Sequence, residues 1–400
     1  MQAPQSKQTQ KSKEWLLAVL VVLLSAFGVY SVTNATFSTS SVLEDTDLNY
    51  ILHSYYGMRQ AIFLFISPVV LIVVSLFPYE SVKRHTRWFY YLACALLTVA
   101  LFGKATGVKA WIDIIWGYTL QPSEFVKLAC IIVTAKYLET NFDPLGSVKS
   151  FFQLALLMGL PWTLTLAQGE TGSVMVMIFS FGVMLFLGGI RLRVLFSIVA
   201  LGIAFFAIVF GVLMASGSTD YRLVRILSIV DPSLVNESAL YQATNSKIAI
   251  GSGGLHGIGT FHPGSFSQLD YVPEDWTDFI FASIGEAHGF IGTFGVLLTY
   301  SAIIARMLYL SRHTLDRFGQ MIIAGVMGML IFHVIENIGM TSGPLPITGI
   351  PLPFLSYGGS NLVTNMIGIG MVLNVVRNRG SGISSALTPQ VNYNMQRYMQ

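Results

Sequence analysis

Long apolar runs of about twenty residues, separated by shorter polar segments, organise the sequence. A helix needs roughly 20 mostly apolar residues to cross the hydrocarbon core of a bilayer, so each run predicts one membrane-spanning helix. Transmembrane strands would instead appear as short alternating stretches. The pattern therefore predicts an all-α, polytopic membrane protein with ten spans, near residues 14–33, 59–78, 88–103, 121–139, 151–167, 172–190, 193–215, 278–305, 317–340 and 361–377.

Composition excludes most other classes of protein. Hydrophobic residues make up 53% of the 400 residues and charged residues only 11%, whereas a soluble domain is usually about 25% charged. A soluble enzyme and a disordered protein are thereby excluded. The net charge of +3 does not point to a nucleic-acid partner. The two cysteines, Cys94 and Cys130, both lie in apolar runs, which argues against a disulfide framework or a cysteine metal site.

The distribution of lysine and arginine predicts the orientation, because cytoplasmic segments of membrane proteins are enriched in them. With ten spans, both termini lie on one side, and that side holds 15 of the 23 basic residues against six on the other. We therefore expect cytoplasmic tails at 1–13 and 381–400 around a single ten-span domain at 14–380. The long loop 216–277 and the Pro/Gly-rich loop 341–360 are then extracellular.

Ionisable residues inside spans are costly and usually have a partner or a function. Glu124 and Lys127 are three residues apart and so share one helix face, where they form either a structural ion pair or the lining of a substrate cavity. His333 and Glu336 have the same spacing, which favours a buried hydrogen-bonded pair over a metal site.

Asp278 stands at the outer end of the eighth predicted span. It suits a helix-capping aspartate, and equally a carboxylate held ionised by the helix dipole to act as a general base at the membrane surface. Glu286 follows eight residues later, about two turns along the same face, so we expect both carboxylates to line one cavity.

Two irregular segments lie in the outer loops. The glycine-rich 251–259 lacks the Lys-Ser/Thr of a phosphate-binding P-loop, so we reject a nucleotide site; a tight turn and pyrophosphate binding through backbone N–H groups both stay open. The segment 343–360 holds four prolines and four glycines yet is largely apolar. We expect it to form a non-helical loop that dips back into the bundle.

Several of these segments together resemble the SEDS family (shape, elongation, division and sporulation). The resemblance covers residues 14–380, and the proline pattern of 343–353 is more similar to RodA-like than to FtsW-like members. Four motifs carry it: Gln121–Glu124 with Lys127, Ala249–Gly257, Thr277–Ala282 with Gly285–Glu286, and Pro351–Ser360.

The resemblance implies a peptidoglycan glycosyltransferase that polymerises lipid II at the outer face of the bacterial cytoplasmic membrane. It matches the family's essential aspartate to Asp278. It also implies a class B penicillin-binding protein as the partner transpeptidase, in addition to membrane lipids. A divalent cation such as Mg²⁺ or Mn²⁺ would be an optional cofactor, since no committed metal-ligand set is visible.

The chain departs from the family pattern at two places. In Gln168–Ser173, Glu170 stands where the family commonly has an aspartate, so the carboxylate reaches one methylene further. In the loop after the third span, Trp111 is retained, but the usual arginine is Ala110 and Lys109 precedes it. Lysine lacks the planar fork of arginine, which puts any bidentate phosphate contact there in doubt.

The implied reaction is an inverting glycosyl transfer with Asp278 as general base, without a covalent intermediate. Outer cations, namely Lys109, Arg222, Arg225 and Lys247, would stabilise the leaving pyrophosphate. Two other classes stay open: a lipid II flippase, although no inverted repeat is evident, and a scaffold that recruits a transpeptidase. The expected substrate-binding or cavity residues are Lys109, Trp111, Glu124, Lys127, Glu170, Lys247, Asp270, Glu286, Ser356 and Ser360.

Overall fold

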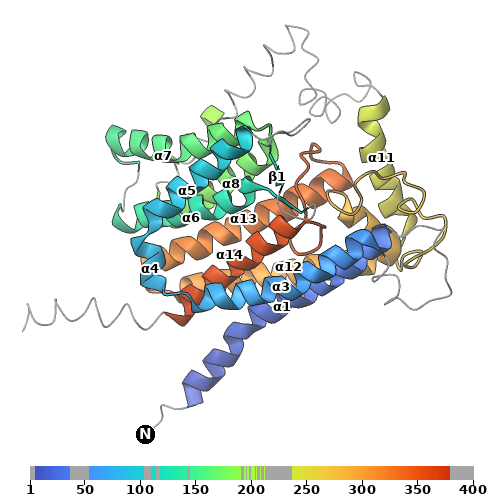
Figure 1. Cartoon of the computed structure of the whole chain (residues 1–400), viewed down its shortest axis with the longest axis horizontal. Coiled ribbons are helices and arrows are strands. Elements are labelled where there is room, and N and C mark those ends of the chain that lie inside the picture. The colour runs from blue at the N-terminus through green and yellow to red at the C-terminus, as the bar shows by residue number, and fades with distance from the viewer. Residues whose placement is uncertain are drawn as a thin grey trace, which may run out of the picture.

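The computed structural model describes residues 5–36, 54–102, 110–113, 118–141, 145–190, scattered positions between 193 and 211, and 237–378. Helices form nearly all of this structure, and most of the long ones run roughly along one direction, whereas the helix Glu237–Ser252 stands at a steep angle to them (Figure 1). The helices are α1 (Gln5–Ala35), α3 (Tyr55–Leu76), α4 (Tyr79–Arg84), α5 (Thr86–Leu101), α6 (Pro122–Thr140), α7 (Val148–Ala167), α8 (Thr171–Leu187), α11 (Glu237–Ser252), α12 (Ile280–Arg312), α13 (Arg317–Ser342) and α14 (Gly359–Arg377). Two short strands, β1 (Ile112–Asp113) and β2 (Thr119–Leu120), pair antiparallel.

Nine of the predicted spans coincide with helices of the bundle, and the all-α membrane fold is confirmed. Among the described helices, six are long and apolar enough to cross a membrane: α1, α3, α7, α12, α13 and α14. Helices α5 and α8 are apolar but shorter. Helix α6 carries the buried Glu124 and Lys127. The remaining prediction, 193–215, falls largely outside the described residues.

Helix α13 is the centre of the bundle. Most of its length is buried, and it packs against α6, α8, α12 and α14. Two glycines allow the close approach: a Cβ on Gly325 would lie 2.6 Å from Ile131 of α6, and one on Gly328 would lie 3.0 Å from Val183 of α8. Ser180 of α8 also donates a hydrogen bond to the Gly325 carbonyl at 2.7 Å.

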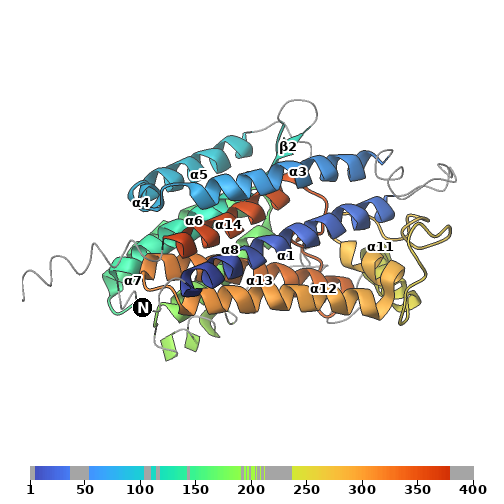
Figure 2. The same ribbon diagram turned by 90° about the horizontal axis from the view of Figure 1, so that it is seen from below.

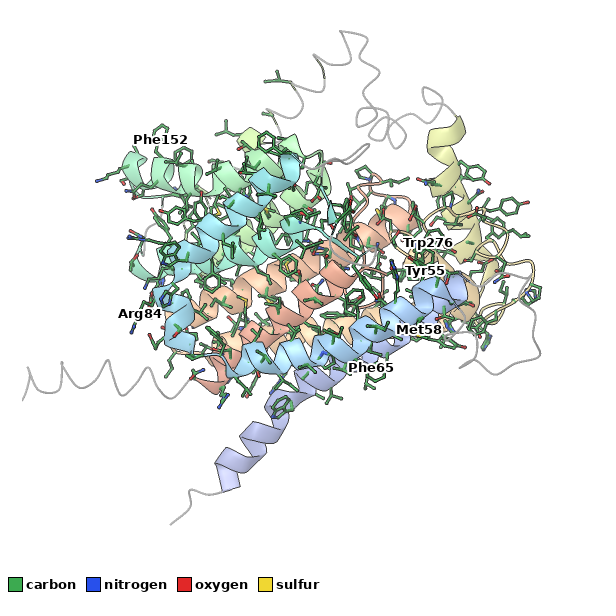
Figure 3. All side chains as sticks on the ribbon, in the orientation of Figure 1. Tyr55, Met58, Phe65, Arg84, Phe152 and Trp276 are labelled. Carbon is green, nitrogen blue, oxygen red and sulfur yellow. The ribbon has the colours of Figure 1, made fainter. Side chains whose placement is uncertain are left out.

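The outer helices present apolar side chains outward, as a bundle surrounded by lipid requires. Phe65 of α3 is 79% exposed and Phe152 of α7 is 65% exposed, and both project from the bundle surface (Figure 3). Turning the bundle shows α3 and α5 along one edge and α12 along the opposite one (Figure 2).

A network of polar contacts ties the helix ends together around α4. Arg317 donates to the Leu138 carbonyl of α6 and to the Gly188 carbonyl just beyond α8, each at 2.7 Å. Lys83 of α4 forms an ion pair with Glu139 of α6. Because unsatisfied helix-terminal carbonyls are costly away from water, these contacts stabilise the ends of the spans.

The glycine-rich segment packs main chain to main chain against a break in α12. Gly289 has φ +63° inside that helix, and a Cβ there would lie 2.4 Å from the Gly257 nitrogen. The Ile258 and Gly259 N–H groups donate to the α12 carbonyls of Glu286 and Ala287 at 3.0 and 3.1 Å. Of the two interpretations left open for 251–259, this geometry favours the tight turn, since these N–H groups already have acceptors.

The Pro/Gly-rich segment is non-helical between Ser342 and Gly359 and folds into the bundle, as expected. Phe354 and Leu355 are at most 1% exposed. The Phe354 carbonyl is so close to α1 that a Cβ on Gly28 would lie 2.4 Å from it. Tyr300 of α12 donates a hydrogen bond to the Pro353 carbonyl. We call residues 343–358 the inserted loop.

Candidate active site

A cavity of about 670 Å³ opens at the end of the bundle where the inserted loop lies. Its walls come from the starts of α3, α6, α8 and α14, from the segment before α12, and from the inserted loop. Six of the residues predicted from the sequence line it together: Trp111, Glu124, Lys127, Glu170, Asp278 and Ser360.

Asp278 lies two residues before α12 and is half-buried. The N-cap of α12 is Phe279, so Asp278 precedes the position that its interpretation as the N-cap residue required. Asn337 of α13 fixes the backbone there: its amide donates to the carbonyls of Asp278 and Ile350, both at 2.8 Å. The Asp278 carboxylate faces Gly349 (φ +70°), where a Cβ would lie 3.2 Å from Oδ2.

Three buried polar side chains line the cavity where α6 meets α13. The Lys127 ammonium lies 2.8 Å from Oε1 of Glu124 and 3.0 Å from Nε2 of His333. Their exposures are 2% for Glu124, 3% for Lys127 and 0% for His333. The expected Glu124–Lys127 ion pair is confirmed, and it both pairs internally and lines the cavity.

The partners of His333 and Glu336 differ from the expectation that they bond to each other. His333 contacts Lys127, while Oε1 of Glu336 accepts a hydrogen bond from the Thr348 hydroxyl of the inserted loop at 2.8 Å. The reason is that α13 is surrounded by other elements, so each side chain finds a better-placed partner across an interface than along its own helix.

Glu170 reaches the cavity from the turn between α7 and α8. Its Oε1 accepts a hydrogen bond from the Gln121 amide at 2.7 Å. Burial raises the pKa of the Glu170 carboxyl above its usual value, although hydrogen bonds oppose the shift. Ser360 lies beside this pair, and its hydroxyl accepts from the Gln121 N–H at 3.2 Å. The start of α6 is thus joined to the starts of α8 and α14.

Arg59 is a cavity residue that the sequence reasoning counted only toward topology. Its guanidinium carbon lies 4.3 Å from the centre of the Tyr55 ring and 4.7 Å from that of Tyr118. The neighbouring Tyr56 stacks on Trp276, which precedes Asp278 by two residues. Figure 3 shows Tyr55 and Trp276 at the same end of the bundle, far from Arg84. The sequence feature that could have identified Arg59 is its position as a single arginine at the start of an apolar run.

Four predicted residues lie elsewhere. Glu286 does not join Asp278 on one wall: its carboxylate accepts from the backbone N–H groups of Phe266 and Ser267. The helical spacing fails because Asp278 precedes the helix. Ser356 is buried and pins the inserted loop by donating to the Thr277 carbonyl. Lys247 and Asp270 are exposed outside the cavity lining, and Lys109, Arg222 and Arg225 fall outside the described residues.

No group of three His, Cys, Asp or Glu side chains within the described ranges is placed to hold a metal ion. The optional divalent cation therefore stays untested. Two cations, Arg59 and Lys127, and the carboxylates of Glu124, Glu170, Glu274 and Asp278 are the charged groups that the structure places around the cavity. Positive charge and a carboxylate are thereby brought together in a partly enclosed space with both polar and apolar walls.

Comparison with known families finds one model, described as a cell cycle protein of the FtsW, RodA and SpoVE group, which matches residues 14–381. The peptidoglycan glycosyltransferase MrdB of Escherichia coli K12 is 36% identical over 315 residues, which cover 78% of this chain and 83% of that protein. Stage V sporulation protein E of Bacillus subtilis is 30% identical over 371 residues, covering 92% and 97%. The peptidoglycan glycosyltransferase RodA of Treponema pallidum is 28% identical over 432 residues, covering 90% and 97%.

Two solved structures have a similar fold. One is a chain of a peptidoglycan synthase complex that coordinates polymerization and crosslinking, with a TM-score of 0.74, 25% identity, and 92% and 98% of the two chains covered. The other is the rod shape determining protein RodA of Thermus thermophilus, with a TM-score of 0.65, 24% identity, and 92% and 97% covered.

Proposed function

Because this chain belongs to the FtsW/RodA/SpoVE family, also called SEDS, we propose that it polymerises lipid II into glycan strands, with Asp278 as the general base. By homology it is a peptidoglycan glycosyltransferase and a multi-pass membrane protein. Beyond this homology, we propose the substrate, the mechanism and the role in cell elongation.

One observation carries the proposal: the Asp278 carboxylate lines the same cavity as Arg59 and Lys127. Glycosyl transfer from a lipid pyrophosphate needs a base for the acceptor hydroxyl and positive charge for the leaving group. Asn337 of α13 anchors the Asp278 backbone by a hydrogen bond, and the lack of a side chain at Gly349 leaves room for the carboxylate. The backbone that carries the base is thereby held in place, as a catalytic group requires.

The proposed reaction is a single displacement. The acceptor hydroxyl attacks the anomeric carbon of the donor, the bond from that carbon to the lipid pyrophosphate breaks, and the hydroxyl proton passes to Asp278. One displacement on an α-linked donor gives a β-linked product, as in inverting hydrolases, which also use one base. Arg59 would stabilise the charge that develops on the departing pyrophosphate, and Lys127 would bind a phosphate oxygen that is already charged in the bound donor.

Cellular role, partner and orientation complete the proposal. We place the chain in cell elongation, with a class B penicillin-binding protein as its transpeptidase. The likeness to a chain of a peptidoglycan synthase complex supports a partner of this kind. With both termini cytoplasmic, the cavity would open at the outer face, where lipid II is polymerised.

Purified Asp278→Ala, supplied with lipid II and the partner transpeptidase, tests the proposal. We expect no glycan strands from it, and normal strands from Glu80→Gln, which removes an exposed carboxylate on α4. Unimpaired strand formation by Asp278→Ala would contradict the proposed base. The flippase alternative would be favoured by two results together: Asp278→Ala translocates lipid II in liposomes, and the unmodified chain does not polymerise it.

A further inference from the structure

The hydrogen bonds of His333 define which of its nitrogens carries the proton. Nδ1 lies 2.7 Å from the Met329 carbonyl oxygen, which can only accept, so Nδ1 carries the proton. Nε2 lies 3.0 Å from the Lys127 ammonium, which can only donate, so Nε2 presents its lone pair. His333 is therefore a neutral imidazole that accepts a hydrogen bond from Lys127.

Two acceptors from two different helices hold the Lys127 ammonium. Glu124 lies one turn earlier on α6, at 2.8 Å, and His333 lies across the interface on α13. Glu124 balances the charge of the ammonium, whereas the neutral His333 orients the ammonium group without changing the charge of the site. A lysine side chain loses rotamer entropy when it is fixed, and the two buried acceptors fix Lys127 before any substrate binds.

An ammonium group has three N–H donors, and Glu124 and His333 engage two of them. Lys127 itself lines the cavity, so the remaining donor is available to an acceptor there. In a buried setting a charged donor forms hydrogen bonds of about twice the usual strength, and phosphate oxygens are the acceptors that match it best.

We infer that His333 is a positioning residue for the glycosyl transfer: as a neutral acceptor it orients the Lys127 ammonium toward a phosphate oxygen of the lipid-linked donor. His333 itself does not contact the substrate. The inference rests on the proposed function, because it assigns a donor pyrophosphate to the cavity.

Replacing His333 by residues with and without an acceptor tests this. In His333→Gln the side-chain oxygen reaches about as far as Nε2, so the hydrogen bond to Lys127 is retained. His333→Phe keeps the ring volume and removes the acceptor, and His333→Leu repeats the removal with a smaller side chain. Each variant is first checked for a monodisperse elution profile and cooperative thermal unfolding.

The readout is the division of the effect between KM and kcat for lipid II. The pyrophosphate is already charged in the ground state, so losing the orientation of Lys127 weakens substrate and transition state alike. For His333→Phe and His333→Leu we expect KM to rise about tenfold with kcat within about threefold. For His333→Gln we expect both constants within about twofold of the unmodified chain.

A double variant separates positioning from packing. If His333 acts through Lys127, Lys127→Met combined with His333→Phe has the same KM as Lys127→Met alone. If the two substitutions instead raise KM independently, so that the KM of the double variant exceeds that of Lys127→Met alone, the inference is overturned. So would a His333→Gln variant as impaired as His333→Phe, since that would indicate a proton-transfer or purely structural role.

Direct binding of lipid II to the Asp278→Asn variant distinguishes this inference from the proposed function. If Asp278→Asn still turns over, the proposed base fails, while a tenfold loss of affinity on adding His333→Phe would still support the positioning role. If Asp278→Asn is inactive but its affinity is unchanged by His333→Phe, the inference alone fails.

Discussion

At the scale of single residues, the sequence located the buried charges but, of their partners, only one that lies on the same helix. Spacing along one helix correctly paired Glu124 with Lys127. It could not place His333 against Lys127, because that contact crosses from α13 to α6. Thr348, the partner of Glu336, is likewise in the inserted loop. Contacts between elements depend on packing, which periodicity within an element does not encode.

Asp275 offers a test of buried charge outside the spans. It is 2% exposed, and burial raises the pKa of its carboxyl well above the usual value, with Asp270, Glu286 and Glu274 adding to the shift and a hydrogen bond from Ser267 opposing it. The folded state therefore binds a proton that the unfolded state releases, so this carboxyl lowers stability as the pH rises above about 4.

We expect Asp275→Asn to remove this penalty. Its unfolding temperature should exceed that of the unmodified chain by an amount that grows from about pH 5 to about pH 8, and the two should converge near about pH 4. Thermal unfolding in detergent across this range measures the effect, with Glu80→Gln, an exposed carboxylate on α4 that does not act on Asp275, as the control. A difference that does not change with pH would contradict the prediction.

At the scale of elements, the apolar runs predicted the position of nine helices, and the composition predicted that 343–360 is not helical, which holds up to the start of α14 at Gly359. The break in α12 at Gly289 could not be foreseen. The run around it is apolar and helix-like, and the break arises because Gly254 and Leu255 accept hydrogen bonds from the α12 N–H groups of Phe290 and Ile291. The carbonyl acceptors therefore come from the segment 251–259 and not from α12 itself.

Gly289→Ala tests this break. The alanine Cβ would lie 2.4 Å from the Gly257 nitrogen, at a positive φ that disfavours any side chain. We expect a loss of stability of at least about 1–3 kcal/mol, measured as a fall in the unfolding temperature.

Gly295→Ala, on the same helix, is the matched control. Nothing lies within 4 Å of a Cβ at that position, so alanine should be neutral or stabilising by up to about 1 kcal/mol. Equal behaviour of the two variants would show that the close approach of 251–259 to α12 does not constrain the fold.

At the scale of the whole molecule, the cavity assembles residues as distant in sequence as Arg59 and Asn361. Motifs such as 277–282 and 351–360 identified several of them through the family resemblance. Arg59 and Tyr118 were missed, because only the packing of α14 against α3 and β2 brings them to the wall. Ser356 was identified by its motif, but it does not line the cavity and instead bonds to the Thr277 carbonyl, since a motif does not distinguish a cavity residue from one that anchors the loop beside it.

Topology is a second property of the whole molecule, predicted from the basic residues. In a background with Cys94 and Cys130 replaced by alanine, single cysteines at Tyr271→Cys and Glu80→Cys report the two ends of the bundle, and both positions are exposed. A membrane-impermeant thiol reagent added to intact cells should label the cysteine at 271 and spare the one at 80. The reverse pattern would place the cavity at the cytoplasmic face and contradict polymerisation outside.

The central claim is that Asp278 is the base of the polymerisation reaction. Asp278→Asn keeps the shape of the side chain and the backbone contact to Asn337, and it removes the basic carboxylate. The decisive measurement is its initial rate of lipid II polymerisation at saturating substrate, compared with Glu80→Gln in the same preparation. We predict a fall of at least about 100-fold for Asp278→Asn and a rate within about twofold for Glu80→Gln. A well-folded Asp278→Asn that polymerises at close to the unmodified rate would contradict the account.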